Sequence, residues 1–284
     1  MKDSLIFRRL VISGILGWIA LFGAIPVLLL TGVSFLQRHP SDLIEAVFSM
    51  ESYARLSDPA IGSMLFKSIM MATMATLLCL LIGYPFAYIV ARANKCHART
   101  MLLFVMIPFW TNTLIRTYAL VAVLKADGFL NTALIFLGII DAPLKIMYTQ
   151  TAVFIGLIYT LLPFMVLPLY AAIEKLDHRL LEASRDLGAS RWTTFKKITI
   201  PLTMPGIVSG CMLVFLPALG MFYIPDILGG ARTMFLGNFV RDQFLIARDL
   251  PMGAASSIAM TSLMGIMLLI YYRNLRRSGR TVRL

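Results

Sequence analysis

The residue types that usually carry chemistry in proteins are few and scattered in this sequence of 284 residues. The three histidines (His39, His97 and His178) share no metal-ligand spacing, and the three cysteines form no CxxC pair. The sequence contains no HExxH, no G-x-S-x-G and no G-x-x-x-x-G-K-[ST] pattern. It therefore predicts no catalytic centre, no metal, no cofactor and no nucleotide site of the P-loop kind.

Aromatic and polar side chains in two segments are the candidates for contact with a solute: Trp110, Asn112, Tyr118, Phe222, Tyr223 and Asp226. Aromatic faces and a carboxylate are groups that can take the place of water around a cation. The same residues also have ordinary structural explanations. Aromatic residues near the ends of membrane helices commonly form an interfacial belt, and Asp226, directly after Pro225, can simply end a helix.

Arg116 is the single charged residue in the otherwise apolar segment 100–124. Because it would repel a cation, we expect it to have a gating or structural role, paired with a carboxylate or a carbonyl. Its charge is also compatible with an anionic cargo, which stays an alternative. A charged side chain in the hydrocarbon core costs free energy, so an arginine at this position is expected to serve a purpose. Counted at 1.5 Å per residue along a straight helix, Arg116 lies about 24 Å from the cytoplasmic end, in the outer half of the membrane.

The amino-acid composition indicates what kind of structural elements carry these residues. Hydrophobic residues make up 59% of the chain, charged residues 14%, and the mean hydropathy is +0.82. Globular domains are roughly 45–50% apolar and about 25% charged. A soluble fold would have too few charges to cover its surface, so the sequence predicts an integral membrane protein.

Six apolar stretches meet or approach the roughly 20 residues that a helix needs to cross a bilayer. They are residues 10–37, 68–91, 100–124, 146–173, 198–225 and 250–272. The first is too long for a signal-peptide core and is expected to remain as an uncleaved anchor. We therefore expect an all-α membrane protein with six transmembrane helices.

The net charge of +12 comes from 26 basic and 14 acidic residues, and its distribution indicates topology. Seventeen of the basic residues lie in the N-terminal segment, the second and fourth connections and the C-terminal tail, where only five acidic residues occur. By the positive-inside rule these parts are cytoplasmic, and so are both termini. The basic excess thus indicates membrane orientation rather than nucleic-acid binding.

The fourth connection, 174–205, has the pattern of a bent pair of short helices. Asp177 can cap a first helix, on which Leu180, Ala183, Ser184 and Leu187 share one face, and Gly188 suits a left-handed turn. Ser190 can cap a second helix that ends before Pro201. An amphipathic helix lying on lipid headgroups is the alternative. The small apolar face and the bend favour docking into a groove of a soluble partner.

The residues Glu182-Ala183-Ser184, Gly188 and Ile198-x-Ile200-Pro201 resemble the EAA loop of bacterial ABC importer permeases. The spacing is the family's, with Ser184 in place of the third residue, alanine, and Ile200 in place of leucine. The resemblance implies a type I ABC importer transmembrane domain in which Glu182, Ala183, Ser184 and Gly188 couple the membrane helices to an ATPase. It also implies a homologous second permease, two ATPase subunits and an extracytoplasmic substrate-binding protein as partners.

A narrower resemblance links the chain to the B-type permease subunits of spermidine/putrescine importers. It rests on 83–88 (GYPFAY), 108–112 (PFWTN) with Arg116, 161–165 (LLPFM) and 228–230 (LGG). It implies a non-catalytic subunit that forms half of a polyamine pathway in the bacterial inner membrane. Iron(III), sulfate, thiamine or an amino acid are alternative cargoes within the same class.

We expect one membrane domain over 1–284, with a peripheral first helix at 10–37, a core of five helices at 62–273 and the coupling loop at 174–205. Partners include membrane lipid and exclude nucleic acid. An ion-coupled secondary transporter is the alternative from a different class, but it would be expected to show intramembrane acids or an inverted repeat. A membrane-bound enzyme is disfavoured because the nucleophile and metal patterns are missing.

Overall fold

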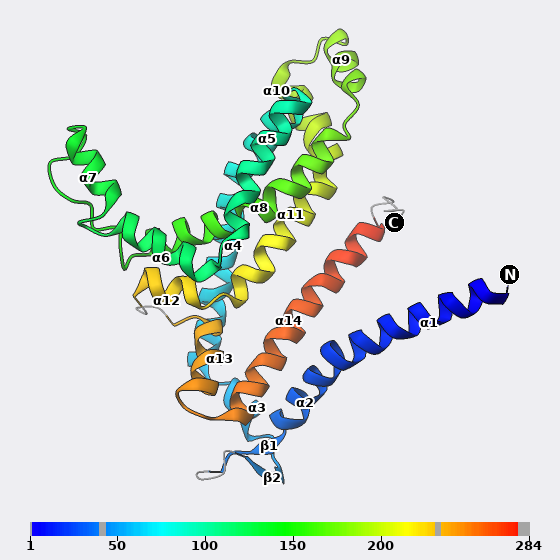
Figure 1. The fold of residues 1–284 in the computed structure, drawn as a ribbon, viewed down its shortest axis with the longest axis vertical. Coiled ribbons are helices and arrows are strands. Elements are labelled where there is room, and N and C mark those ends of the chain that lie inside the picture. Colours follow the sequence, from blue (N-terminus) through cyan, green and yellow to red (C-terminus); the bar gives the residue numbers. More distant parts are fainter. Residues whose placement is uncertain (1, 40–43, 231–233, 278–284) are drawn as a thin grey trace. The chain divides into compact units, whose positions relative to one another are not determined.

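The computed structural model describes residues 2–39, 44–230 and 234–277, which are mostly helical (Figure 1). In chain order the elements are α1 (Lys2–Ile19), the π-helical turn η1 (Ala20–Ala24), α2 (Ile25–Ser34), β1 (Leu36–Gln37), β2 (Glu45–Phe48), α3 (Glu51–Leu56), α4 (Pro59–Arg92), α5 (Lys95–Met106), the 3-10 turn η2 (Ile107–Trp110), α6 (Thr113–Leu124), α7 (Phe129–Phe136), α8 (Gln150–Glu174), α9 (His178–Asp186), α10 (Arg191–Thr194), the π-helical turn η3 (Phe195–Thr199), α11 (Ile200–Gly220), α12 (Tyr223–Gly229), α13 (Leu236–Leu245) and α14 (Leu250–Arg277). The two strands pair antiparallel as a short hairpin.

Six helical segments of the described residues are long and apolar enough to cross a membrane. They are Val11–Ser34, Pro59–Arg92, Thr113–Phe136, Gln150–Glu174, Arg191–Gly220 and Leu250–Arg273. This confirms the prediction of an all-α membrane protein with six spans. In the fourth span, 56% of the most apolar window is buried within the chain, which is the largest share among the six. Its neighbouring helices therefore pack around this one.

The third predicted span, 100–124, is not a single helix. α5 ends at Met106, the short turn η2 follows, and α6 begins at Thr113. Pro108 has no N–H to donate in this stretch, and the Asn112 side chain accepts a hydrogen bond from the N–H of Leu114 (2.8 Å), which starts a new helix. Figure 1 shows α6 leaving the direction of α5. Arg116 therefore lies in the first turn of α6, and the straight helix along which its depth was counted does not form.

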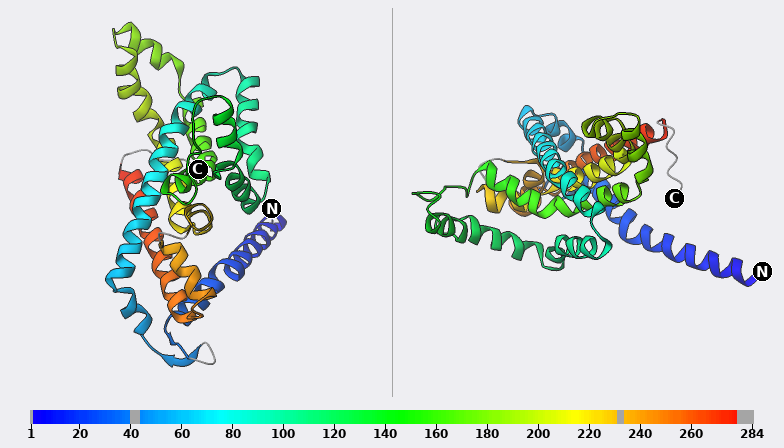
Figure 2. Two further views of the ribbon diagram at one scale, coloured as in Figure 1. Left: turned by 90° about the vertical axis from the view of Figure 1, so that its left-hand side faces the viewer. Right: turned by 90° about the horizontal axis from the view of Figure 1, so that it is seen from above.

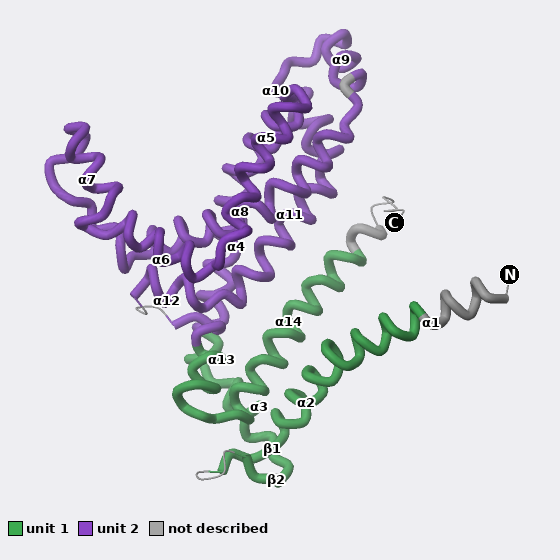
Figure 3. Tube along the Cα trace, viewed as in Figure 1, with its two compact units in different colours: residues 1–63, 239–284 green, residues 64–238 purple. Residues whose placement is uncertain are grey.

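The described residues form two compact units, which Figure 3 shows in different colours. Unit 1 combines Met1–Ser63 with Phe239–Leu284, and unit 2 is Met64–Asn238. The fourth connection and all of the candidate solute-contacting residues belong to unit 2. The geometry of the candidate site can therefore be described within this unit alone.

Unit 2 is built on α8. Its fully buried large side chains include Leu157, Leu161, Met165, Val166 and Leu169 of that helix. α11 lies beside α8 (Figures 1 and 2), and two glycines allow the close approach. A Cβ atom at Gly206 would lie 2.8 Å from the carbonyl oxygen of Pro168, and one at Gly210 would lie 2.8 Å from the sulfur of Met165. Small residues at such a contact let membrane helices gain van der Waals contact along their backbones.

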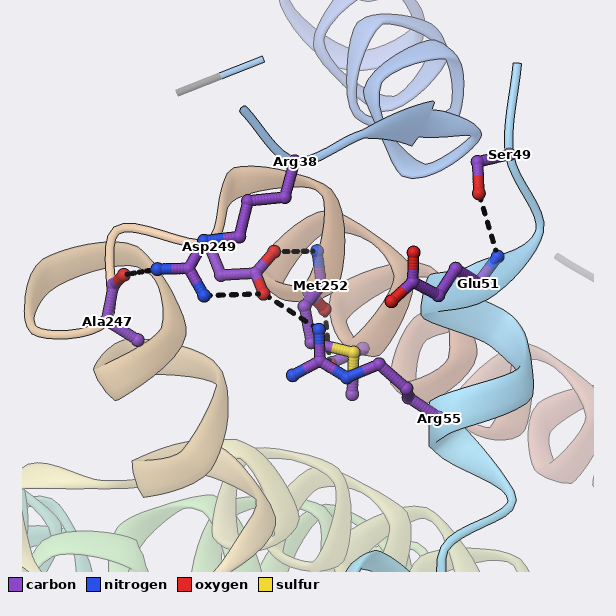
Figure 4. Close-up of polar contacts among 8 residues, drawn as sticks. Arg38, Ser49, Glu51, Arg55, Ala247, Asp249 and Met252 are labelled. Atoms are coloured by element: carbon purple, nitrogen blue, oxygen red, sulfur yellow. Dashed lines mark hydrogen bonds and ion pairs between the residues drawn. The ribbon is translucent and has the colours of Figure 1, made fainter. Parts of the chain in front are cut away.

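In unit 1, Asp249 joins three segments next to the start of α14 (Figure 4). Its side chain is 1% exposed, lies 3.6 Å from Nη1 of Arg38, and accepts a hydrogen bond from Nη1 of Arg55 (3.0 Å). Its other oxygen accepts a hydrogen bond from the N–H of Met252 (3.0 Å) in the first turn of α14. Arg38 also donates to the carbonyl of Ala247 (3.0 Å). The buried carboxylate is thus compensated on both oxygens, as a buried charge must be.

Candidate functional site

The connection between the fourth and fifth spans folds into two short helices joined by a left-handed turn. Asp177 caps α9 by accepting a hydrogen bond from the N–H of Arg179 (3.0 Å), and Ser190 caps α10 by accepting one from the N–H of Thr193 (3.2 Å). Gly188, between them, has a φ of +78°, which glycine adopts without the steric penalty of a side chain. Both caps and the left-handed turn agree with the sequence prediction.

The second helix was predicted to end before Pro201, and this is wrong. α10 passes through η3 directly into α11, so that Arg191–Gly220 is one continuous helical segment. In η3 the N–H of Ile200 bonds to the carbonyl of Phe195, five residues back rather than four. This wider turn comes just before Pro201, where the proline ring would crowd an ordinary α-helical turn. The connection therefore continues into the fifth span without a break.

The side chains of α9 and α10 divide into an inward and an outward set. Ser184 is 6% exposed, and its hydroxyl is 2.6 Å from that of Thr194, which fastens α9 to α10. The outward set includes the exposed residues Leu180, Glu182, Ala183, Leu187 and Trp192, together with charged side chains such as Arg185 and Asp186. Of the face predicted for α9, only Ser184 is turned inward. Leu187 is 89% exposed and Trp192 71%, and exposed apolar side chains among charges are typical of a protein docking surface.

An aromatic cluster behind these helices was missed in the sequence. The ring of Phe195, at the start of η3, meets Tyr84 and Tyr88 of α4 edge-on, with centroid distances of 5.7 and 6.4 Å. On its other side Phe195 stacks against Trp192 (5.8 Å). The guanidinium carbon of Arg92 lies 4.3 Å from the centroid of Tyr88. The four-residue spacing of Tyr84, Tyr88 and Arg92, which puts them on one helix face, was the available signal.

Three of the candidate solute-contacting residues lie at the break between α5 and α6. Trp110 is 79% exposed in η2, and Tyr118 is 61% exposed on α6. Asn112 has a structural function, because its side chain caps α6. Two of these three residues thus project from the surface of the chain, and the third holds the break in place.

The other three candidates lie on or beside α12. The rings of Phe222 and Tyr223 meet edge-on with a centroid distance of 6.1 Å. Asp226 accepts a hydrogen bond from Nδ2 of Asn238, which also donates to the carbonyl of Phe222 (3.2 Å). Asn238 is 3% exposed, and its other amide atom, Oδ1, has no hydrogen-bond partner among the described residues. Sequence reasoning missed Asn238, which lies twelve residues from Asp226 in a different helix.

Arg116 is 7% exposed in the first turn of α6. Its Nη2 donates a hydrogen bond to Oγ1 of Thr113 (3.1 Å), while Nε and Nη1 have no partner among the described residues. Its guanidinium carbon lies 5.2 Å from the ring centroid of Phe109 and 6.0 Å from that of Tyr159. α6, which carries Arg116, is in contact with α12. Aromatic rings and a hydroxyl thus stand where a carboxylate or carbonyl was expected.

The family described as binding-protein-dependent transport system inner membrane component matches this chain over residues 80–283, which is more than half of its length. This chain belongs to that family. The matched region contains the whole of α9, α10 and α11, together with all of the candidate solute-contacting residues. The six spans described above agree with an inner-membrane component that crosses the bilayer several times.

Several relatives of this family are similar over nearly the whole chain. The spermidine/putrescine transport system permease protein PotB of Escherichia coli (strain K12) is 52% identical over 271 residues, 95% of this chain and 98% of PotB. PotB of Haemophilus influenzae (strain ATCC 51907 / DSM 11121 / KW20 / Rd) is 47% identical over 278 residues, 98% of this chain and 97% of that protein. The inner membrane ABC transporter permease protein YdcU of Escherichia coli (strain K12) is 31% identical, covering 79% of this chain and 74% of YdcU.

Two solved structures share the fold. A bacterial ABC transporter involved in the import of the acidic polysaccharide alginate has a TM-score of 0.73 at 18% identity, covering 97% of this chain and 96% of that one. An alginate ABC transporter in complex with an alginate-bound periplasmic protein has a TM-score of 0.77 at 16% identity, covering 99% and 96%. These likenesses confirm the predicted ABC importer transmembrane fold.

Proposed function

We propose that this chain is a permease subunit of an ATP-driven importer, and that its cargo is a polyamine such as spermidine or putrescine. The observation that supports the cargo is the 47–52% identity, over 95% or more of the chain, to permeases named for spermidine/putrescine transport. Because the sequence contains no P-loop, ATP hydrolysis takes place on two separate ATPase chains. A homologous second permease completes the pathway, and an extracytoplasmic binding protein delivers the cargo.

The coupling surface in this proposal is the outward set of α9 and α10. It combines exposed apolar side chains with Glu182 and Ala183, and it is held rigid by the hydrogen bond between Ser184 and Thr194. A docked ATPase that closes on ATP would push on α9, and the continuous segment Arg191–Gly220 would carry the push into the membrane. Alternating access then follows as a shift between two arrangements of the spans.

The cargo is tested in proteoliposomes that contain the permease pair, the ATPases and the cognate binding protein. We expect spermidine or putrescine to be taken up only with ATP, and the loaded binding protein to stimulate ATP hydrolysis. Iron(III), sulfate, thiamine and amino acids serve as competing cargoes. Selective uptake of one of these compounds would identify it as the cargo in place of a polyamine. Uptake by the purified chain without the ATPases would instead show an ion-coupled carrier.

Replacing Gly188 with valine tests the coupling surface. A β-branched residue at a φ of +78° carries a backbone penalty of at least about 1–2 kcal/mol, so the turn between α9 and α10 must change shape. We expect ATPase association and uptake both to fall at least about tenfold. Gly138, with a φ of +67° and open space around it, is the matched control, because G138V imposes the same strain outside the coupling surface. Wild-type association in G188V would contradict the proposal.

Membrane orientation is tested with the native cysteines. Cys96 is exposed in the second connection, whereas Cys79 is buried and Cys211 is half-buried within spans. With both termini cytoplasmic, we expect a membrane-impermeant maleimide to label inside-out vesicles and not right-side-out ones. The C96S variant, which should lose the label, identifies the site. Labelling of Cys96 in right-side-out vesicles would reverse the proposed orientation.

We propose a gating role for Arg116. An R116M variant keeps the apolar stem but removes a buried charge with two unpartnered nitrogens, each of which costs about 1–3 kcal/mol when left unsatisfied. We therefore expect its thermal unfolding temperature to be unchanged or higher, while uptake falls about tenfold. R116K, which keeps a charge without the planar group over Phe109, is the comparison variant. A lowered unfolding temperature would indicate a structural role, and unchanged uptake would remove the gating role.

A further inference from the structure

The coupling surface connects to the fifth span through the backbone, but it has no such connection to the second. α10, η3 and α11 form one helical segment, so any displacement of α10 is carried directly into α11. α4, the second span, ends at Arg92 and is separated from α9 in sequence by two further spans. Displacement of the coupling surface can therefore reach α4 only through side chains.

Phe195 supplies two of these side-chain contacts. It lies at the junction between α10 and η3, and its ring meets the edges of Tyr84 and Tyr88 with interplanar angles of 81° and 88°. Edge-to-face rings at these distances attract one another and keep a defined mutual orientation. A second connection lies about two turns further along the same helical segment, where the hydroxyls of Tyr84 and Thr203 are 3.1 Å apart. Thr203 is fully buried in α11.

The π-helical turn sets the direction in which Phe195 points. One extra residue in a helix changes the angular position of everything before it by about 100° relative to everything after it. Phe195 is the first residue of η3 and its carbonyl accepts the five-residue hydrogen bond. The extra residue thus changes the angle between two faces of the segment, the outward face of α10 with Trp192 and the inward face of α11 with Thr203. A regular helix would not give this angle.

α4 also contacts α8, close to the residues that meet Phe195. A Cβ atom at Gly83 would lie 3.0 Å from Cγ of Met165, which shows that α4 and α8 are in close contact there. At the end of α4, Tyr88 and Arg92 line a narrow cavity together with Leu181 of α9. α4 therefore contacts α8 at Gly83 and contacts the start of η3 through Tyr84 and Tyr88.

We propose that Phe195 is a positioning residue that transmits displacement of the coupling surface to the second span, through its ring contacts with Tyr84 and Tyr88. This inference rests on the proposed function, because it requires an ATPase that pushes on α9 and α10. In this arrangement Trp192 receives contact from outside, Phe195 passes it on, and α4 turns or tilts together with α11. Two spans thus move as one, although only one of them is continuous with the coupling surface.

The decisive variant is F195L in the complete complex with its second permease, ATPases and binding protein. Leucine keeps an apolar side chain at the junction but removes both edge-to-face contacts. Each contact is expected to contribute about threefold to the amount of cargo transported per ATP hydrolysed. We expect association with the ATPases and ATP hydrolysis to stay within twofold of the wild type, while cargo transported per ATP hydrolysed falls about tenfold. F195Y, which retains the ring, should restore the ratio to within about threefold.

Phe86 provides the matched control. It lies on α4 between Tyr84 and Tyr88, is half-buried like Phe195, and makes none of the ring contacts found among the described residues. We expect F86L to leave the ratio of transport to ATP hydrolysis within twofold of the wild type. A second comparison combines Y84L with F195L. Because both remove the same contact, their effects should be less than additive.

The outcomes separate this inference from the proposed function. If F195L transports as much cargo per ATP as the wild type, Phe195 does not transmit displacement and the inference fails. If F195L loses the ATPases, Phe195 belongs to the docking surface, and the inference also fails. Fully additive effects of Y84L and F195L would likewise overturn it. Failure of the proposed function would show itself differently, as normal ATPase association in G188V.

Discussion

The hydrocarbon core of a membrane offers no hydrogen-bond partners, so every backbone N–H and C=O within it must be satisfied by the chain itself. The spans are therefore helices, and irregular backbone is confined to places where other groups compensate it. In unit 2 three such places matter: η2 with the Asn112 cap, the π-helical turn η3, and the junction between α11 and α12. Each carries residues of the candidate site. Trp110 lies in the first, Phe195 begins the second, and Phe222 and Tyr223 follow the third.

The same constraint explains how a soluble ATPase could act on membrane helices. A helix whose backbone bonds are all internal is stiff along its axis, so a segment that runs unbroken from α10 to the end of α11 transmits displacement with little loss. In the proposed coupling, the contact of Gly206 and Gly210 with α8 would carry this displacement to the centre of unit 2. A break before Pro201 would have separated the coupling surface from the span. The wider turn at η3 lets the helix pass the proline without interruption.

The sequence predicted those features that depend on local chemistry. Long apolar stretches define the spans. Asp177, Gly188 and Ser190 define the bent pair of helices α9 and α10, because caps and left-handed turns need only neighbouring residues. It did not predict the break of the third span, where Pro108 acts together with a cap four residues later. Nor did it predict contacts that depend on tertiary packing. Tyr84 and Phe195, or Asp226 and Asn238, lie on different helices, and only the packed structure brings each pair together.

The fold itself does not decide the charge of a cargo. Structures with the same fold belong to an importer of an acidic polysaccharide, whereas the curated relatives are named for spermidine and putrescine transport. The fold alone therefore does not set selectivity, and among the candidate residues Arg116 carries a charge whose sign opposes a polycation. Its burial changes that conclusion. The residue is only 7% exposed, and its guanidinium lies near the rings of Phe109 and Tyr159, so its charge is largely withdrawn from the surface of the chain. Aromatic faces attract cations, so a buried arginine at this position is compatible with a positively charged cargo.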